Sequence, residues 1–213
     1  MKVLDLFAGI GGFSLGLERA GMETVAFCEI EDYPRKVLAK HWPGVPIYED
    51  VKELTSERLR ADGIIGIDVI TAGFPCQDIS TAGRGAGIEG ERSGLWSEIA
   101  RLSGELRPRY IILENVSALL SRGLDKVLGD LAEIGYDAEW HCIPASHLGA
   151  PHRRDRWWCV ADTNSERYRG RDREERGGEG RFIQQSEQTG GAVGREVEGC
   201  GSPYREDVAD TYR

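Results

Sequence analysis

The sequence predicts an α/β fold with a doubly wound, mostly parallel sheet. Short apolar runs rich in Val and Ile alternate along the chain with segments of helical period. Glycines fall where several of these units turn, and strand–helix alternation of this kind is typical of a parallel sheet covered by helices on both faces. The 213 residues, 40% of them hydrophobic and 30% charged, are enough to bury a sizeable core.

The alternation begins almost at the N-terminus and continues to Ala161. The expected strands, which are short and apolar, are 3–7, 24–28, 46–48, 67–72, 110–113, 138–143 and 157–161. The expected helices are 13–20, 33–41, 95–106 and 124–134. Gly21 and Gly135 end two of these helices, and Pro43 stops a third.

The composition changes after Ala161. Residues 162–213 are dominated by Gly, Arg, Glu, Gln and Ser and show no sustained hydrophobic period. Such a segment buries too little apolar surface to offset its ordering entropy. We therefore expect a folded domain over 1–161, followed by a polar disordered tail or a linker over 162–213.

Composition excludes several protein classes. No apolar run approaches the roughly 18 to 20 residues of a membrane helix, and no secretory leader precedes the first strand, which predicts a soluble cytoplasmic protein. The net charge of −9 argues against a protein that coats nucleic acid, although a local basic patch stays open. The five cysteines include no C-x-x-C pair, so neither a zinc site nor a disulfide framework is expected.

A glycine-rich turn follows the first expected strand. In the run 5–12, DLFAGIGG, the glycines allow close backbone approach and leave helix N–H groups aimed at an anionic group. Glu29 ends the second strand, twenty residues after Gly9, where a carboxylate can bind ribose hydroxyls. Loop and acid together favour an adenosine-containing cofactor, either a dinucleotide or S-adenosylmethionine. The alternative is that the glycines only make a tight turn.

A cysteine follows the most apolar strand. Cys76 lies in the run 73–77, GFPCQ, at the strand end where doubly wound sheets bind ligands. The glycine-rich residues after it suit a mobile lid. Glu114 ends the next strong strand, so the two loops are expected to open onto one crevice. A thiolate beside a carboxyl group suits acid-assisted nucleophilic catalysis. The alternatives are a Cys76 that is a small buried hydrophobic residue and a Glu114 that caps a helix or forms a surface salt bridge.

The third cluster is basic. Residues 151–156, PHRRDR, hold three arginines in an otherwise acidic protein. If Arg154 and Arg156 have strand spacing, both side chains point to one face. The arginine fork suits a phosphate or a carbonyl oxygen. The alternative is a solvated edge strand paired with nearby acids.

Taken in order, these motifs resemble those of the DNA cytosine-5 methyltransferases of bacterial and bacteriophage type. The resemblance covers the run 5–12, Glu29, Asp50, the Pro-Cys-Gln at 75–77, the Glu-Asn-Val at 114–116 and the 152–156 cluster. It extends to about residue 161. It implies the Rossmann-like fold of S-adenosylmethionine-dependent methyltransferases and transfer of a methyl group to C5 of cytosine in double-stranded DNA.

The resemblance also implies roles for individual residues. The cofactor-binding set is Phe7, Ala8, Gly9, Ile10, Gly11, Glu29, Ile30, Asp50, Val51 and Pro75. Within it, Phe7 and Ile30 flank the adenine, Glu29 holds the ribose, and Asp50 with Val51 meets the adenine edge. The catalytic set is Cys76, Glu114, Arg154 and Arg156. Residues 80–92 form the lid, with Arg92 and Leu95 where it re-enters the domain.

The implied chemistry explains these residue types. A cysteine thiolate adds to C6 while Glu114 contacts the ring nitrogens, which makes C5 nucleophilic, and the thiolate later leaves readily. The base must first be flipped out of the duplex. Two departures from the family stand out: His152 replaces the usual Gln, and no target-recognition domain follows residue 161. A separate recognition domain or subunit is therefore an expected partner.

Three alternatives stay open at this point. The chain can be a truncated remnant that binds cofactor or DNA without methylating alone. It can act on tRNA, because the same carbon chemistry serves both nucleic acids. A nicotinamide-dependent oxidoreductase fits the glycine loop and Glu29, but that class requires neither the Pro-Cys-Gln nor the Glu-Asn-Val motif.

Overall fold

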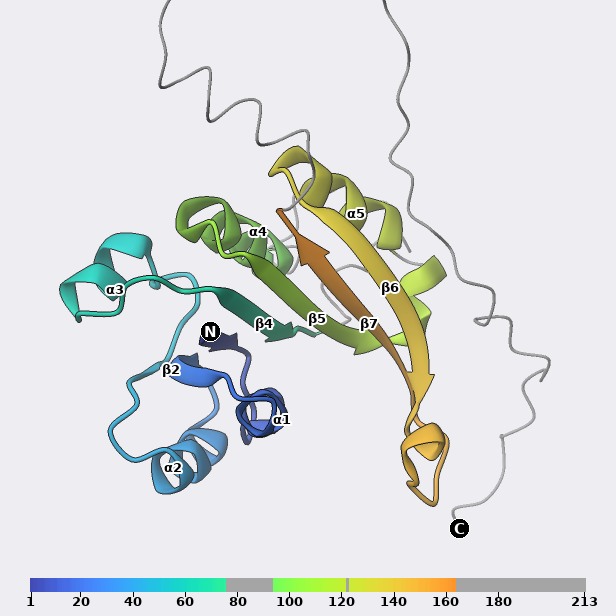
Figure 1. Ribbon diagram of the computed structural model, residues 1–213, viewed down its shortest axis with the longest axis horizontal. Helices are drawn as coiled ribbons and strands as arrows, with labels where there is room; N and C mark the ends of the chain where they lie inside the picture. Colours follow the sequence, from blue (N-terminus) through green and yellow to red (C-terminus); the bar gives the residue numbers. More distant parts are fainter. Residues whose placement is uncertain (76–93, 122, 164–213) are drawn as a thin grey trace, which may run out of the picture.

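A computed structural model describes residues 1–75, 94–121 and 123–163. In this part of the chain, seven strands form one sheet in the order β3-β2-β1-β4-β5-β7-β6 (Figure 1). The strands are β1 (Lys2–Leu6), β2 (Glu23–Cys28), β3 (Ile47–Tyr48), β4 (Val69–Gly73), β5 (Tyr110–Val116), β6 (Asp137–Pro144) and β7 (Asp155–Asp162). The α-helices are α1 (Gly12–Arg19), α2 (Asp32–His41), α3 (Ser56–Ala61), α4 (Gly94–Leu106) and α5 (Leu124–Glu133).

The first five strands run parallel, and β7 runs antiparallel to both of its neighbours. The start of β7 therefore lies at the carboxyl ends of the parallel strands, where Arg156 pairs with Val116 at the end of β5. Strand order reverses on either side of β1, since β2 and β4 both pair with it. This is the position where doubly wound sheets bind ligands.

The sheet is covered on both faces. Figure 1 shows α4 and α5 on one side of the strands, with α1 and α2 on the other. The main core lies under the first pair and contains Trp96 from α4 and Trp157 from β7, both fully buried. A smaller cluster of Ala8, Phe27 and Leu38 packs under α2. Alternate residues of each strand face the two layers, so the central strands are mostly apolar on both faces, with the buried Asp5 and Thr71 as exceptions.

The structure confirms the expected strands and helices, with shifts of a few residues at their ends. One shift affects the site: β5 continues to Val116, so Glu114 lies within the strand rather than at its end. Three short helices were not expected, namely α3 and the 3-10 turns η2 (Ser117–Ser121) and η3 (Ala145–Leu148). They are too short for hydrophobic periodicity, and only α3 carries a local signal, because the Thr55 hydroxyl accepts from the Arg58 amide.

Two composition-based expectations can be compared with the described residues. Within 1–75, 94–121 and 123–163, no helix is long and apolar enough to cross a membrane, and no cluster of potential metal ligands is present. Cys28 and Cys159 are free and buried. Cys142 on β6, however, is disulfide-bonded, a bond that the cysteine spacing does not predict.

Candidate active site

The turn after β1 is shaped by its glycines. Gly9 has φ +54° and Gly11 has φ +88°, the left-handed region that glycine adopts without strain. A Cβ on Gly11 would lie 2.5 Å from the ring of Trp42. Trp42 is in turn fixed by its indole nitrogen, which donates to Glu18 Oε1 at 2.6 Å. A side chain at position 11 therefore fits neither the backbone nor the space.

Glu29 joins the turns after β1 and β2. Its Oε2 accepts from the Gly9 amide at 2.7 Å and its Oε1 accepts from the Glu31 amide at 2.8 Å. A carboxylate has about four acceptor sites, so two such bonds leave capacity for ribose hydroxyls. The side chain is mostly buried, which makes it a fixed feature of the turn.

The surroundings of Glu29 fit an adenosine moiety. Ile10 and Ile30 flank this edge with exposed fractions of 61% and 65%, unusual for isoleucine in a folded domain. Phe7 is partly buried, and among residues 1–75, 94–121 and 123–163 no atom lies within 4 Å of a Cβ added to Gly9. Apolar surface beside a carboxylate is what an adenosine moiety requires.

A turn after β3 completes this side of the edge. Asp50 is half-buried and Val51 is buried. The Lys52 amide donates to Asp50 Oδ1 at 2.9 Å, which fixes the carboxylate. Asp50 and Glu29 are close enough to Cys28 to act on it electrostatically, so the turns after β2 and β3 meet.

The turn after β4 lies next to the glycine turn, because β4 pairs with β1. Asn115 holds it: its Nδ2 donates to the Phe74 carbonyl at 3.0 Å, and its Oδ1 accepts from the Val116 amide at 2.8 Å. Asn115 is almost completely buried. Pro75 follows and is exposed. Cys76 comes next and lies outside the described residues.

Glu114 and Arg156 form the charged part of the site. Arg156 Nε is 2.7 Å from Glu114 Oε1, and the two side chains are 20% and 25% exposed. Glu114 Oε2 would lie 3.5 Å from a Cβ on Gly73, its partner in the neighbouring strand β4. The absence of a side chain at position 73 therefore leaves this carboxylate open on one side.

Arg154 differs from the expectation of strand spacing. Strand β7 begins at Asp155, and Arg154 has φ +40°. The alternation of side chains along a strand therefore does not extend to Arg154, so it gives no reason for Arg154 and Arg156 to share a face. The Arg154 carbonyl accepts from the Ala145 amide at 3.2 Å, which joins this turn to η3. Arg154 and His152 are both exposed.

Two buried cysteines are unsuited to nucleophilic catalysis. Burial, together with the nearby charges of Asp50 and Glu29, raises the pKa of Cys28 to about 12. Burial alone raises the pKa of Cys159 to about 12. The thiolate is the nucleophilic form, so both thiols are inert near neutral pH.

Sequence reasoning missed a buried carboxylate under the site. Asp5 is completely buried on β1 and accepts from the hydroxyls of Ser14 at 2.8 Å and Thr71 at 2.7 Å. Burial raises the pKa of Asp5 to about 6, against the lowering effect of these hydrogen bonds. The network joins β1, α1 and β4 directly beneath the glycine turn. The sequence did contain a signal for this network, because Asp5 is a charged residue between apolar neighbours in an expected strand.

The structure thus brings the expected residues to one edge of the sheet in two groups. Phe7–Gly11, Glu29, Ile30, Asp50 and Val51 lie after β1, β2 and β3. Pro75, Glu114 and Arg156 lie around the ends of β4, β5 and the start of β7. Leu95 is in the first turn of α4. The lid 80–92, including Arg92, and most of the tail 162–213 lie outside the described residues.

The chain is similar to known proteins in sequence and in fold. The family model described as C-5 cytosine-specific DNA methylase matches residues 1–200. The Type II methyltransferase M.CviJI of Paramecium bursaria Chlorella virus IL3A is 41% identical over 163 residues, 75% of this chain and 42% of its own length. A Type II methyltransferase of Bacillus subtilis strain 168 is 38% identical over 164 residues, 73% of this chain and 40% of its own.

A solved structure supports the fold as well. The crystal structure of a protein encoded within an Escherichia coli prophage superposes with a TM-score of 0.64 at 29% identity. That alignment covers 76% of this chain and 46% of the other. The chain therefore spans less than half the length of these relatives. On the family match and the curated relatives together, the chain belongs to the C-5 cytosine-specific DNA methylase family.

Proposed function

We propose that this chain is the catalytic portion of a DNA (cytosine-5-)-methyltransferase, which transfers a methyl group from S-adenosylmethionine to C5 of cytosine in double-stranded DNA. The observation that carries the proposal is the Glu114–Arg156 pair beside the β4 turn that leads into Cys76. Family membership and the two Type II methyltransferases support the same reaction. Neither relative favours the alternative of a non-catalytic remnant.

Different residues bind different parts of the cofactor. Glu29 accepts hydrogen bonds from the ribose hydroxyls, Phe7 and Ile30 flank the adenine, and Asp50 and Val51 contact the adenine edge. Ala8, Gly9, Ile10 and Gly11 line the methionine end, with Pro75 opposite. S-adenosylmethionine supplies the electrophilic methyl group.

The protein's own residues prepare the base. The Cys76 thiolate forms a bond to C6 of a flipped cytosine while the Glu114 carboxyl group donates its proton to N3. The ring then carries an electron pair at C5, which takes the methyl group. Loss of the C5 proton to a base restores the C5–C6 double bond, which breaks the C6–sulfur bond and releases Cys76 as a thiolate, and N3 returns its proton to Glu114. Arg156 positions Glu114 through their 2.7 Å contact, and Arg154 lies by the target base and its backbone.

The charge distribution supports DNA as the partner. The protein is acidic overall, with a formal charge of −9, and the run 152–156 concentrates positive charge at one end of β7. DNA is therefore bound at that end, and a separate recognition domain or subunit supplies sequence specificity. We place the protein in the cytoplasm of a bacterium or of a bacteriophage host, within a restriction-modification system.

The test is transfer of a labelled methyl group to mixed-sequence DNA, with Cys76→Ala as the matched variant. We expect 5-methylcytosine from the unmodified chain, alone or with a recognition domain added in trans, and none from Cys76→Ala. A parallel reaction with tRNA decides between the nucleic acids. Equal product from Cys76→Ala, or no product under either condition, would contradict the proposal.

A further inference from the structure

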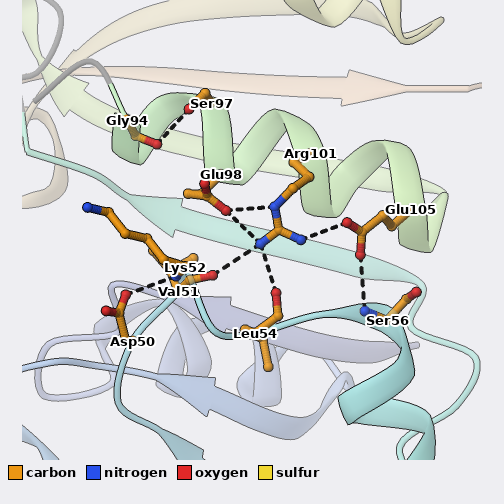
Figure 2. Close-up of polar contacts among 10 residues, drawn as sticks. All are labelled: Asp50, Val51, Lys52, Leu54, Ser56, Gly94, Ser97, Glu98, Arg101 and Glu105. Atoms are coloured by element: carbon orange, nitrogen blue, oxygen red, sulfur yellow. Dashed lines mark hydrogen bonds and ion pairs between the residues drawn. The ribbon is translucent and has the colours of Figure 1, made fainter. Parts of the chain in front are cut away.

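Arg101 lies in the middle of α4 and contacts two carboxylates of its own helix (Figure 2). Its Nε donates to Glu98 Oε2 at 2.7 Å, and its Nη1 donates to Glu105 Oε1 at 2.7 Å. Glu98 and Glu105 stand three residues before and four residues after Arg101, so all three share one helix face. The two carboxylates fix the plane of the guanidinium.

The remaining nitrogen reaches a different part of the chain. Arg101 Nη2 donates to the carbonyl oxygen of Leu54 at 2.8 Å and to that of Val51 at 3.2 Å. Figure 2 shows the guanidinium between α4 and this turn, with the two carbonyls pointing toward it. Glu105 adds a second link, since its Oε2 accepts from the Ser56 amide at 3.1 Å.

The backbone of the turn over residues 50–54 forms few short hydrogen bonds of its own. It follows β3, which has only two residues. Its internal backbone hydrogen bonds are long, 3.2 Å from the Glu53 amide to the Asp50 carbonyl and 3.3 Å from the Leu54 amide to the Val51 carbonyl. The Lys52 amide holds the Asp50 carboxylate, and Val51 is buried in the main core. The contacts from α4 add two hydrogen bonds that tie the Val51 and Leu54 carbonyls to the rest of the domain.

We propose that Arg101 is a positioning residue that holds Asp50 and Val51 against the adenine edge of S-adenosylmethionine. The proposal rests on the cofactor assigned in the proposed function. Arginine suits this role because its planar fork donates to four oxygens at fixed angles, whereas lysine offers a single point charge. Burial acts to lower the pKa of Arg101, but the hydrogen bonds with Glu105 and Glu98 raise it, so the cation is retained.

The test is a calorimetric comparison of two ligands, S-adenosylhomocysteine and S-inosylhomocysteine. The second has a carbonyl where adenine has its 6-amino group, so the ratio of their dissociation constants reports contact at that edge. For Arg101→Gln we expect S-adenosylhomocysteine to bind about tenfold more weakly, the size of one charge-assisted hydrogen bond. We expect S-inosylhomocysteine binding to change little, so that the ratio falls toward one.

Two further variants serve as references. Arg101→Lys is expected to lie between the wild type and Arg101→Gln, because it keeps the charge but loses the fork. Lys126→Gln removes a helical ion pair of the same spacing on α5, whose recorded partner is Asp130 on the same helix, and is expected to bind both ligands as the wild type does.

The outcomes separate this proposal from the proposed function. An unchanged ligand ratio in Arg101→Gln, or equal weakening of both ligands, would overturn the positioning role while the cofactor assignment stands. Failure of the wild type to bind S-adenosylhomocysteine would overturn both. If the wild type binds but transfers no methyl group, the ligand ratio still decides the role of Arg101.

Discussion

The two halves of the site differ in the groups that form them. On the side of β1, β2 and β3, the site consists of short turns, and Glu29 joins two of them by accepting from the amides of Gly9 and Glu31. On the side of β4, β5 and β7, charged side chains from strands far apart in the sequence meet, with Glu114 paired to Arg156. The first half suits a ligand held in one place. The second suits a reaction in which charge moves.

Under the proposed function, this contrast assigns cofactor binding to the first half and the reaction to the second. Disturbing a turn that contacts a ligand through its backbone weakens binding of that ligand. Replacing one member of a charged pair lowers the rate of the reaction, because the pair stabilises charge that develops on the substrate in the transition state. Mutations in the two halves are therefore expected to affect different measured quantities.

The largest expected effect comes from a matched pair of isosteric substitutions. Glu114→Gln is expected to lower the rate of methyl transfer about a hundredfold to ten-thousandfold, the range of a lost proton-handling group. Its dissociation constant for S-adenosylhomocysteine should stay within twofold of the wild type. Glu29→Gln should weaken that ligand at least about tenfold, because it loses a charged acceptor for two backbone amides. Single-turnover rates at saturating cofactor and calorimetric binding measure the two quantities.

The opposite result for these two variants would contradict the difference between the two halves. If Glu114→Gln lost cofactor affinity and Glu29→Gln lost only rate, the two halves would not divide binding from chemistry.

A second prediction concerns the rigidity of the cofactor half. Gly11→Ala is expected to lower the free energy of unfolding by about 2–4 kcal/mol, because it adds left-handed strain and a methyl group 2.5 Å from Trp42. Gly21→Ala is the control: its φ is +84°, and nothing lies within 4 Å of the added Cβ. It should lose only about 1–2 kcal/mol, the strain alone. Urea unfolding of both variants measures the difference, and equal losses would show that Trp42 does not hold the turn.

A third prediction concerns pH. Asp5 has its pKa raised from 3.8 to about 6, chiefly by burial, so the folded state binds its proton more tightly than the unfolded state. Its contribution to stability is therefore complete below about pH 4 and is lost as pH rises to about 6, a change of about 3 kcal/mol. Asp5→Asn keeps a polar partner for Ser14 and Thr71 without the titration.

The measurement is the free energy of unfolding at several values between pH 4 and pH 7. Relative to Asp5→Asn, the wild type should lose stability across this range. Parallel curves for the two proteins would mean that Asp5 is not the titrating group.

The sequence predicts the cofactor half more completely than the reaction half. Gly9, Gly11 and Glu29 act through local turns whose chemistry is visible in the residue types themselves. The contact between Glu114 and Arg156 joins residues 42 positions apart and depends on the antiparallel direction of β7. Short apolar runs do not reveal strand direction, so the contact between these two side chains was not predicted.

Other features were beyond prediction for physical reasons. Asn115 belongs to a recognised motif, but its hold on the Phe74 carbonyl depends on the register of β4 and β5. Arg101 looks like one more charge on a helix surface, and its partners Val51 and Leu54 are backbone carbonyls that leave no trace in the sequence. The expectation that Arg154 and Arg156 share a face assumed that both lie in a strand, but β7 begins at Asp155, one residue after Arg154.

The most direct test of the central claim is covalent trapping on DNA that contains 5-fluorocytosine. Fluorine at C5 cannot leave as a proton does, so the bond between Cys76 and C6 cannot be broken once the methyl group has been transferred. We expect a DNA adduct that requires S-adenosylmethionine, maps to the peptide containing Cys76 by mass spectrometry and is absent in Cys76→Ala. The experiment is run with and without a recognition domain in trans. An adduct on another residue, or none under either condition, would contradict the account.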